Sequence, residues 1–213
     1  MRIAAAGVCH LVRLFLLILL SALPSASVDA EDHRIEPGES PQAVMDRAAA
    51  GDRLVFLPGL HQHAPGRHRA LLYVDKSIEI ELQEGAVLKL ADDVCQLEPE
   101  GEVTTDQDGP ETYGIRIGHG TQSEYIENVR IYGRGTIDLN SSRNAQPSGL
   151  VRNINACVLV HGRVRGVTVG GITMQHTNRS VMCYGEHTGE FLAGGQTGAG
   201  ESFDAEDNVI RSD

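Results

Sequence analysis

Short clusters of β-branched and other apolar residues, separated by glycine, asparagine, aspartate and serine, follow one another along most of the chain. We predict strands over these clusters, at residues 53–57, 71–74, 77–82, 87–90, 114–117, 128–131, 136–139, 156–160, 167–169, 172–175, 181–184 and 208–211. Strands this short are unlike those of an ordinary β-sandwich, and they follow one another too closely for βαβ units. The pattern therefore predicts an all-β chain of many short strands.

Two junctions between predicted strands repeat each other. The apolar triplet 129–131 leads through a glycine-containing turn into a second strand. The triplet 167–169 does the same through Gly170 and Gly171. A coil that cannot bury its apolar face alone must stack on its neighbours, so the repeat favours a solenoid. An antiparallel β-sandwich with one stray helix is the alternative.

One helix signal precedes these strands. Ser40 is a good N-cap residue, Pro41 suits the first helical position and Gly51 follows the last one. These signals predict a helix over residues 41–50. Its apolar side includes Val44, and this side must cover another apolar surface. We therefore expect the helix to cap the first coil, because the end of a solenoid core would otherwise be exposed.

The first 30 residues have the features of a secretory signal peptide. Arg2 and Arg13 precede the apolar run 14–20, and small residues follow within 25–30. The apolar run is shorter than the ~20 residues that span a bilayer, and a retained anchor is the alternative. We expect cleavage near residue 30, a folded domain over residues 31–213, and a secreted protein, periplasmic or extracellular.

Charge and cysteine usage narrow the class of protein. The chain has 18 basic and 29 acidic residues and a net charge of −11, which argues against nucleic acid as a partner. No second apolar stretch approaches membrane length, so we expect no membrane partner after signal cleavage. Cys95, Cys157 and Cys183 follow the predicted signal peptide. We expect buried thiols at these positions, with one disulfide and one free thiol as the alternative.

Three segments resemble a known family. Residues 40–59 resemble the capping helix, Gly-Asp link, first strand and Pro-Gly turn that open right-handed parallel β-helix proteins of the pectate-lyase superfamily. Residues 128–138, with their Gly-x-Gly-Thr-Ile-Asp sequence, and residues 166–178 resemble coils of the polygalacturonase branch. The resemblance covers about residues 35–185. It implies an all-β fold, a right-handed parallel β-helix solenoid with an N-terminal capping α-helix.

The resemblance also implies action on a polysaccharide, most simply an acidic one. Polygalacturonase-like hydrolysis uses paired carboxylates, one to protonate the leaving oxygen and one to activate water. Asp204 and Asp207 are the candidates for this pair, and His176, Arg179 and His187 are the candidates for substrate binding. Hydrolysis of this kind needs no cofactor or metal, whereas a lyase of the same fold would use Ca²⁺.

The family's catalytic sequence signature is incomplete up to residue 213, so we expect further coils after it and a β-helix domain that is incomplete at its C-terminal end. Two alternatives to hydrolysis stay open. In a lyase of the same fold, a base removes the proton beside a carboxylate and a cation stabilises the resulting charge. A non-catalytic β-helix would instead serve as a surface module for glycan binding or adhesion.

Three further features have a structural interpretation that we favour over a chemical one. We expect Asp138 to order its turn through backbone amides. The spacing of His61, His63 and His68 allows a metal site, but a solvated loop is the interpretation that we favour. The segment Gly118-His119-Gly120 precedes the Gly-x-Gly-Thr-Ile-Asp sequence, whereas the Gly-His-Gly of the polygalacturonase branch comes after it. We therefore expect His119 on a surface loop.

Overall fold

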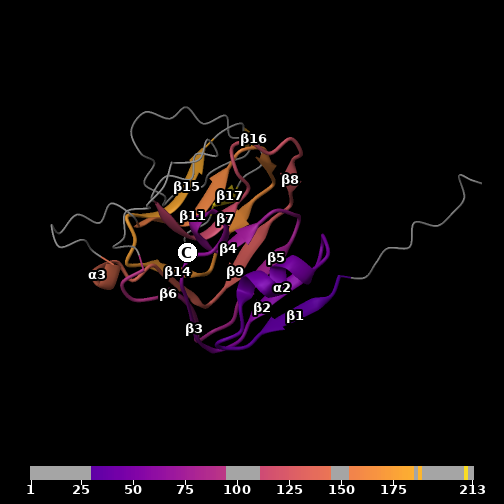
Figure 1. The fold of residues 1–213 in the computed structure, drawn as a ribbon. Coiled ribbons are helices and arrows are strands. Elements are labelled where there is room, and N and C mark those ends of the chain that lie inside the picture. The colour runs from indigo at the N-terminus through magenta and orange to yellow at the C-terminus, as the bar shows by residue number, and fades with distance from the viewer. Residues whose placement is uncertain (1–29, 95–110, 145–153, 185–186, 189–208, 211–213) are drawn as a thin grey trace, which may run out of the picture.

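A computed structural model describes residues 30–94, 111–144, 154–184, 187–188 and 209–210, and this part of the chain is predominantly β (Figure 1). Its helices are α2 (Pro41–Arg47), the 3₁₀ turn η1 (Arg67–Arg69) and α3 (Ser141–Asn144). Its strands are β1 (Asp32–Ile35), β2 (Arg53–Phe56), β3 (Gly59–His63), β4 (Ala70–Val74), β5 (Glu79–Leu82), β6 (Ala86–Leu90), β7 (Thr112–Ile117), β8 (Ile126–Glu127), β9 (Arg130–Gly133), β10 (Thr136–Asp138), β11 (Ile154–His161), β12 (Val164–Arg165), β13 (Thr168–Val169), β14 (Thr173–Gln175), β15 (Arg179–Tyr184), β16 (His187–Thr188) and β17 (Val209–Ile210). None of these helices is long and apolar enough to cross a membrane.

The strands form four sheets, and the chain visits them in a repeating order. Sheet A has the order β1-β2-β5-β9-β13-β17, sheet B β3-β6-β10-β14, sheet C β4-β7-β11-β15 and sheet D β8-β12-β16. Every strand pair among the described residues is parallel. The expected all-β fold of short strands is confirmed, and the antiparallel sandwich is contradicted because its pairs would alternate in direction.

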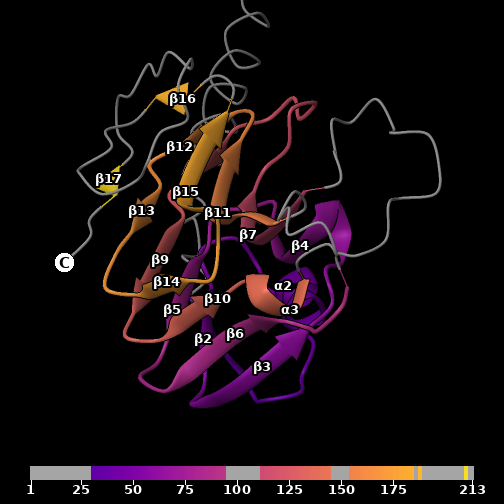
Figure 2. The same cartoon turned by 90° about the vertical axis from the view of Figure 1, so that its left-hand side faces the viewer.

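Figure 2 shows the strands β3, β6, β10 and β14 of sheet B stacked one above another. Because such strands pair in parallel register, their inward-facing side chains are aligned into rows across each sheet. One residue from each strand contributes to a row, as in Leu54, Ile80, Ile131 and Val169 of sheet A, and Leu72, Ile115, Val158 and Val181 of sheet C. These residues belong to one buried core that extends from β1 to β15. Because fully burying such an aliphatic side chain contributes about 1.5–3 kcal/mol, the rows provide the main stabilisation of the fold.

The two junctions that repeat in the sequence stack on each other in space. Thr168 and Val169 of β13 pair with Arg130 and Ile131 of β9, immediately before the two turns. A Cβ atom at Gly171, where φ is +71°, would lie 2.7 Å from the carbonyl oxygen of Gly133. Glycine is needed there because both the positive φ and the close backbone approach exclude a side chain.

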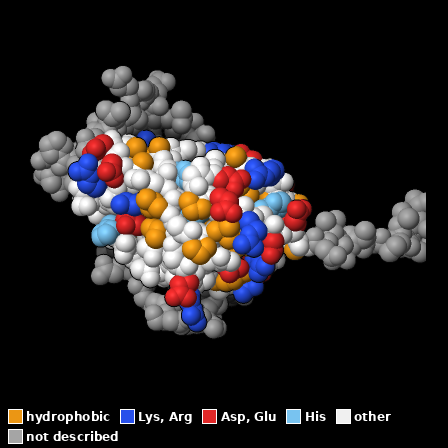
Figure 3. Space-filling view, turned by 90° about the horizontal axis from the view of Figure 1, so that it is seen from below, with side chains coloured by type: hydrophobic (Ala, Val, Ile, Leu, Met, Phe, Trp, Pro, Cys, Tyr) orange, Lys and Arg blue, Asp and Glu red, His pale blue; other side chains and the backbone are white. Residues whose placement is uncertain are grey.

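Charged side chains follow the outward face of sheet A. Asp32, Arg53, Glu79 and Arg130 occupy one register position on successive strands, with alternating sign. Arg53 Nε donates to Asp32 Oδ1 at 2.8 Å, and Arg130 Nη1 donates to Glu79 Oε1 at 2.8 Å. Exposed pairs of this kind contribute little free energy each. Figure 3 shows acidic and basic side chains interspersed over one face of the molecule, as in this row.

Helix α2 covers the edge of sheet C at β4. The Ser40 hydroxyl accepts from the backbone N–H of Ala43, as its N-cap position predicts. Gln42 pairs with the strand edge through its amide, which accepts from Tyr73 N at 2.8 Å and donates to Tyr73 O at 3.3 Å. Val44 and Met45, two residues of α2, are fully buried and belong to the main core.

The helix ends at Arg47, earlier than the predicted residue 50. Ala48 has an extended backbone, and the Oδ2 atom of Asp52 accepts from Ala49 N at 2.7 Å. The other oxygen of Asp52 accepts from Glu31 N at 3.0 Å, and His33 Nε2 lies 2.8 Å from Oδ2. Asp52 therefore joins the end of α2 to β1. These hydrogen bonds, first the one from Glu31 N, lower the pKa of Asp52 to about 2.

The substitution Val44→Asp should destabilise the protein by about 3 kcal/mol or more, because it places an unpaired charge in the apolar contact under α2. The measurement is the free energy of unfolding in urea. Ala43→Asp is the matched control, since Ala43 is exposed on the same helix and should change stability little. Equal stability of the two variants would contradict the capping role of α2.

Asp52 should make the fold sensitive to acid. Its folded pKa lies below the ordinary value of 3.8, so its stabilisation is complete above that value and is lost as the pH falls toward about 2. Asp52→Asn should cost about 2 kcal/mol at pH 7, because backbone donors lose their carboxylate, and this difference should shrink between pH 4 and pH 2. Glu84→Gln is the control, since the Glu84 side chain is 81% exposed. A difference between wild type and Asp52→Asn that does not change with pH would refute the assignment.

Candidate functional site

The connection between β14 and β15 surrounds a pocket of about 190 Å³, lined by residues 174–180. His176 and Arg179, two of the substrate-binding candidates from the sequence, both line it. The strands on either side fix this connection, since β14 pairs with β10 in sheet B and β15 pairs with β11 in sheet C. The pocket is therefore built at the corner between two sheets.

His176 forms a hydrogen-bonded pair with Asp138, the last residue of β10. The Nδ1 atom of His176 lies 2.8 Å from Oδ1 of Asp138, which also accepts from Asn140 N at 2.7 Å. Oδ2 of Asp138 accepts from Gln175 Nε2 at 3.0 Å. Asp138 is therefore both the turn-ordering residue that the sequence predicts and the partner of His176.

The environment of Asp138 keeps its carboxylate ionised. Burial, with only 6% of the residue exposed, raises its pKa, but the hydrogen bonds from Asn140 N, Gln175 and His176 outweigh burial and hold the pKa below 3.8. A carboxylate can only accept hydrogen bonds, so we assign the shared proton to Nδ1 of His176. In the neutral imidazole the Nε2 atom then carries the lone pair.

The backbone at His176 is fixed in an uncommon conformation. Its φ is +52°, in the left-handed region that residues other than glycine seldom occupy. Leu139 N donates to Gln175 O at 3.2 Å, and Ser141 N donates to His176 O at 3.2 Å. These bonds from the segment that follows β10 hold the conformation, while the His176 side chain stays 55% exposed. His176 is thus both positioned and accessible to a ligand.

Arg179 begins β15 and gives the pocket a positive charge. Its backbone pairs with Ala156, and its carbonyl accepts from the hydroxyl of Thr177 at 2.9 Å. His187 begins β16 and pairs with Val164 in sheet D, so its backbone belongs to a different sheet from His176 and Arg179. The catalytic candidates Asp204 and Asp207 lie outside the described residues.

The solvated loop expected for the early histidines is wrong for two of them. His61 and His63 lie on β3, where His61 is fully buried and His63 half-buried. They pair with Leu88 and Leu90 and therefore face inward with those residues. The ring of His68 instead stacks on that of His119 at a centroid distance of 5.2 Å and lies tilted against the ring of Tyr73 at 4.3 Å. Within the described ranges, no group of three His, Cys, Asp or Glu residues could hold a metal ion.

A buried arginine on the outward face of sheet C was missed by the sequence analysis. Arg116 of β7 is 1% exposed, and its guanidinium donates to His68 O at 2.9 Å and to Gly118 O at 3.3 Å. Its Nη2 atom lies 3.3 Å from His161 Nδ1. The alternation of Ile115, Arg116 and Ile117 was the available signal, because it places Arg116 outward between two inward residues.

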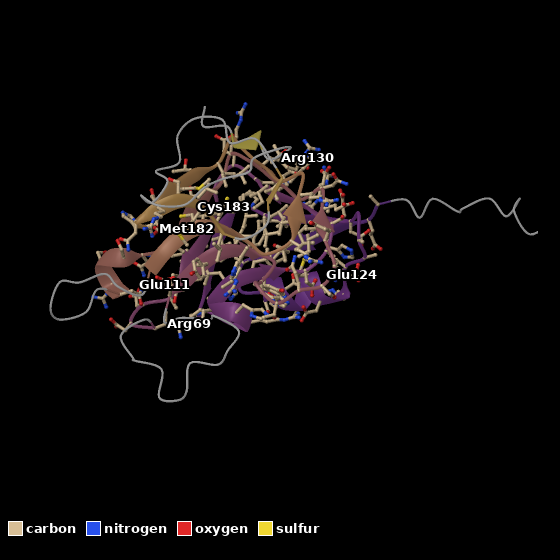
Figure 4. The ribbon with its side chains drawn as sticks, turned by 90° about the horizontal axis from the view of Figure 1, so that it is seen from above. Arg69, Glu111, Glu124, Arg130, Met182 and Cys183 are labelled. Carbon is tan, nitrogen blue, oxygen red and sulfur yellow. The ribbon has the colours of Figure 1, made fainter. Side chains whose placement is uncertain are left out.

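A small apolar cluster adjoins Arg116 on the same outward face. It comprises Ala70, Tyr113, Ala156, Leu159 and Met182. In Figure 4, Met182 and Cys183 lie side by side on β15, and Arg69 lies close to Glu111, whose carbonyl accepts from Arg69 Nε. These apolar residues are at most 7% exposed, so this part of sheet C is covered. The β14–β15 pocket is the better candidate for a ligand site.

Comparisons with protein families, with curated proteins and with solved structures found no match to this chain. The case for function therefore rests on the pocket itself. Calcium, which a lyase of the expected family would use, does not fit the described pocket. Its lining residues include no carboxylate, and both oxygens of the nearby Asp138 already accept hydrogen bonds from N–H donors.

Cys157 and Cys183 should resist thiol reagents in the folded protein. Both thiols are buried and neither belongs to a disulfide, and burial is the main cause that raises the pKa of Cys157 to about 12. Only the thiolate reacts, so labelling should require unfolding. Peptide-resolved mass spectrometry after alkylation, with and without denaturant, measures this. Ala43→Cys provides an exposed thiol as a positive control, and native labelling of Cys157 and Cys183 at its rate would refute the prediction.

Proposed function

We propose that this chain is a secreted right-handed parallel β-helix that binds an acidic polysaccharide at the β14–β15 pocket. Three observations support the β-helix: the repeating order of the sheets, the parallel register and the stacked turns at Gly133 and Gly171. The right-handed path follows from the general preference of crossovers between parallel strands. The signal-like sequence of residues 1–30 supports secretion.

The observation that carries the proposal is the Asp138–His176 pair on the same pocket as Arg179. A guanidinium is the side chain best suited to pair with the carboxylate of a uronic acid. An imidazole oriented by a carboxylate offers a lone pair to a proton on the bound sugar. The pocket thus combines a group that recognises an acidic sugar with a group that transfers a proton.

These residues favour β-elimination over hydrolysis as the chemistry of the pocket. In β-elimination, Nε2 of His176 would take the proton from the carbon beside the carboxylate. The electron pair of that C–H bond forms the new C=C bond, the C–O bond to the neighbouring sugar breaks, and the leaving oxygen takes a proton from solvent. Arg179 would stabilise the charge that develops on the carboxylate. Hydrolysis by Asp204 and Asp207 remains the second candidate, which the resemblance to polygalacturonases favours.

The test measures binding and turnover separately on the purified chain with polygalacturonate and, as a neutral comparison, dextran. We expect binding to polygalacturonate alone, and Arg179→Gln should weaken it about tenfold or more, equivalent to about 1.4 kcal/mol. His176→Gln should abolish the absorbance of the unsaturated product while binding persists. Arg134→Gln is the matched control, because its side chain is 81% exposed and lies on another sheet corner.

Each alternative gives a different result. Release of reducing ends without unsaturated product would indicate hydrolysis and direct attention to Asp204 and Asp207. Binding without either product would indicate a glycan-binding module. The proposal fails if polygalacturonate does not bind, or if Arg179→Gln binds it as tightly as Arg134→Gln does.

A further inference from the structure

Cys157 of β11 adjoins the β14–β15 pocket from the side of the core. The residue is 0% exposed and belongs to the main core, and its Sγ atom donates to the carbonyl oxygen of Ile137 in β10 at 3.6 Å. Burial is the main cause that raises the pKa of this thiol, and hydrogen bonds with the Thr177 hydroxyl and the Gln175 backbone act in the opposite direction. The thiol therefore contacts β10, the end of β14 and the connection that follows it.

The two pocket residues that meet this thiol flank His176 in the chain. Gln175 precedes it, and its Nε2 atom donates to Oδ2 of Asp138, the carboxylate that orients His176, at 3.0 Å. Thr177 follows it, and its hydroxyl donates to the carbonyl oxygen of Arg179 at 2.9 Å. A displacement of either residue would thus shift a partner of His176 or the backbone of Arg179.

The backbone at His176 needs support from more than one side. Its φ of +52° lies in a region that residues other than glycine seldom occupy, and such a conformation persists only where the surroundings fix it. The segment after β10 holds it through the carbonyl oxygens of Gln175 and His176, and Cys157 adds a support from the core. This support is itself fixed, because a Cβ atom at Gly114 of β7 would lie 2.5 Å from the carbonyl oxygen of Cys157.

We propose that Cys157 is a positioning residue of the β14–β15 pocket, and that its thiol fixes the places of His176 and Arg179 relative to each other. The inference rests on the proposed function of this pocket. A thiol suits the place because it packs as a small apolar side chain and still acts as a weak donor and acceptor. A methyl group there would lose these contacts, whereas a hydroxyl would keep them.

The test compares Cys157→Ala and Cys157→Ser with Cys183→Ala as the matched control. Cys183 is also a buried core thiol, near the end of β15 away from the pocket (Figure 4). Hydrogen–deuterium exchange over residues 174–180 and the imidazole signals of His176 in ¹H–¹⁵N NMR spectra report on the pocket without a ligand.

We expect both alanine variants to lose thermal stability, but only Cys157→Ala to exchange faster over residues 174–180 and to shift the His176 signals. Its turnover of polygalacturonate should fall about tenfold, because the acting groups are misplaced. Cys157→Ser should stay close to wild type in all three measurements. A purely structural role would instead affect the two alanine variants alike.

Equal exchange and equal His176 signals in Cys157→Ala and Cys183→Ala would overturn the inference, as would a Cys157→Ser variant that is disturbed as strongly as Cys157→Ala. If Cys157→Ala does not fold, Thr177→Val decides, because it removes the half-buried hydroxyl that meets the thiol. Thr177→Val should show the same local changes, and wild-type exchange in it would contradict the inference. Failure of wild type to bind polygalacturonate would overturn the proposed function alone, since the comparison of exchange and NMR signals needs no ligand.

Discussion

The structure depends on one constraint: each strand takes its backbone hydrogen bonds from the strands one pass before and after it, in parallel register. A residue that faces inward must then lie directly over an inward residue of the previous pass. Leu54, Ile80, Ile131 and Val169 satisfy this across sheet A, and one polar residue placed in that row would interrupt the core of two passes. Two other features follow from this constraint. Helix α2 covers the end of the rows, and the stacked turns at Gly133 and Gly171 keep successive strands aligned.

The same register assembles the candidate site. Asp138 pairs with Gln175, so the residue after each, Leu139 and His176, leaves its strand at the same height and turns the corner together. This arrangement brings Asp138 within hydrogen-bond distance of His176, although the two are 38 positions apart in the sequence. The Asp138–His176 pair therefore results from the stacking of strands. Its geometry is well defined because both residues lie at or directly after the ends of rigid strands.

Alternating apolar residues made most of the fold predictable, and deviations from them explain what was missed. Strand β3 was not predicted from the sequence because its inward positions are His61 and His63. Polar residues at these positions favour a loop over a strand with an apolar face. The strands β8 and β12 have two residues each, too few to show a period. His176 and Arg179 could be named from their place in a recognisable coil, but no local pattern shows that Asp138 meets His176. That contact depends on tertiary register, which one sequence without its fold does not contain.

The corners between sheets differ in the chain length that they accept. From sheet A to sheet B the glycine turns at Gly133 and Gly171 lie in backbone contact, so an extra residue in one would displace the other. From sheet B to sheet C, the connection after β6 runs from Leu90 to Thr112, whereas the one after β14 has only residues 176–178. The connections of this chain thus differ in length at the corner between sheets B and C. A designer who wished to change ligand preference would diversify loop length there and leave the glycine edge untouched.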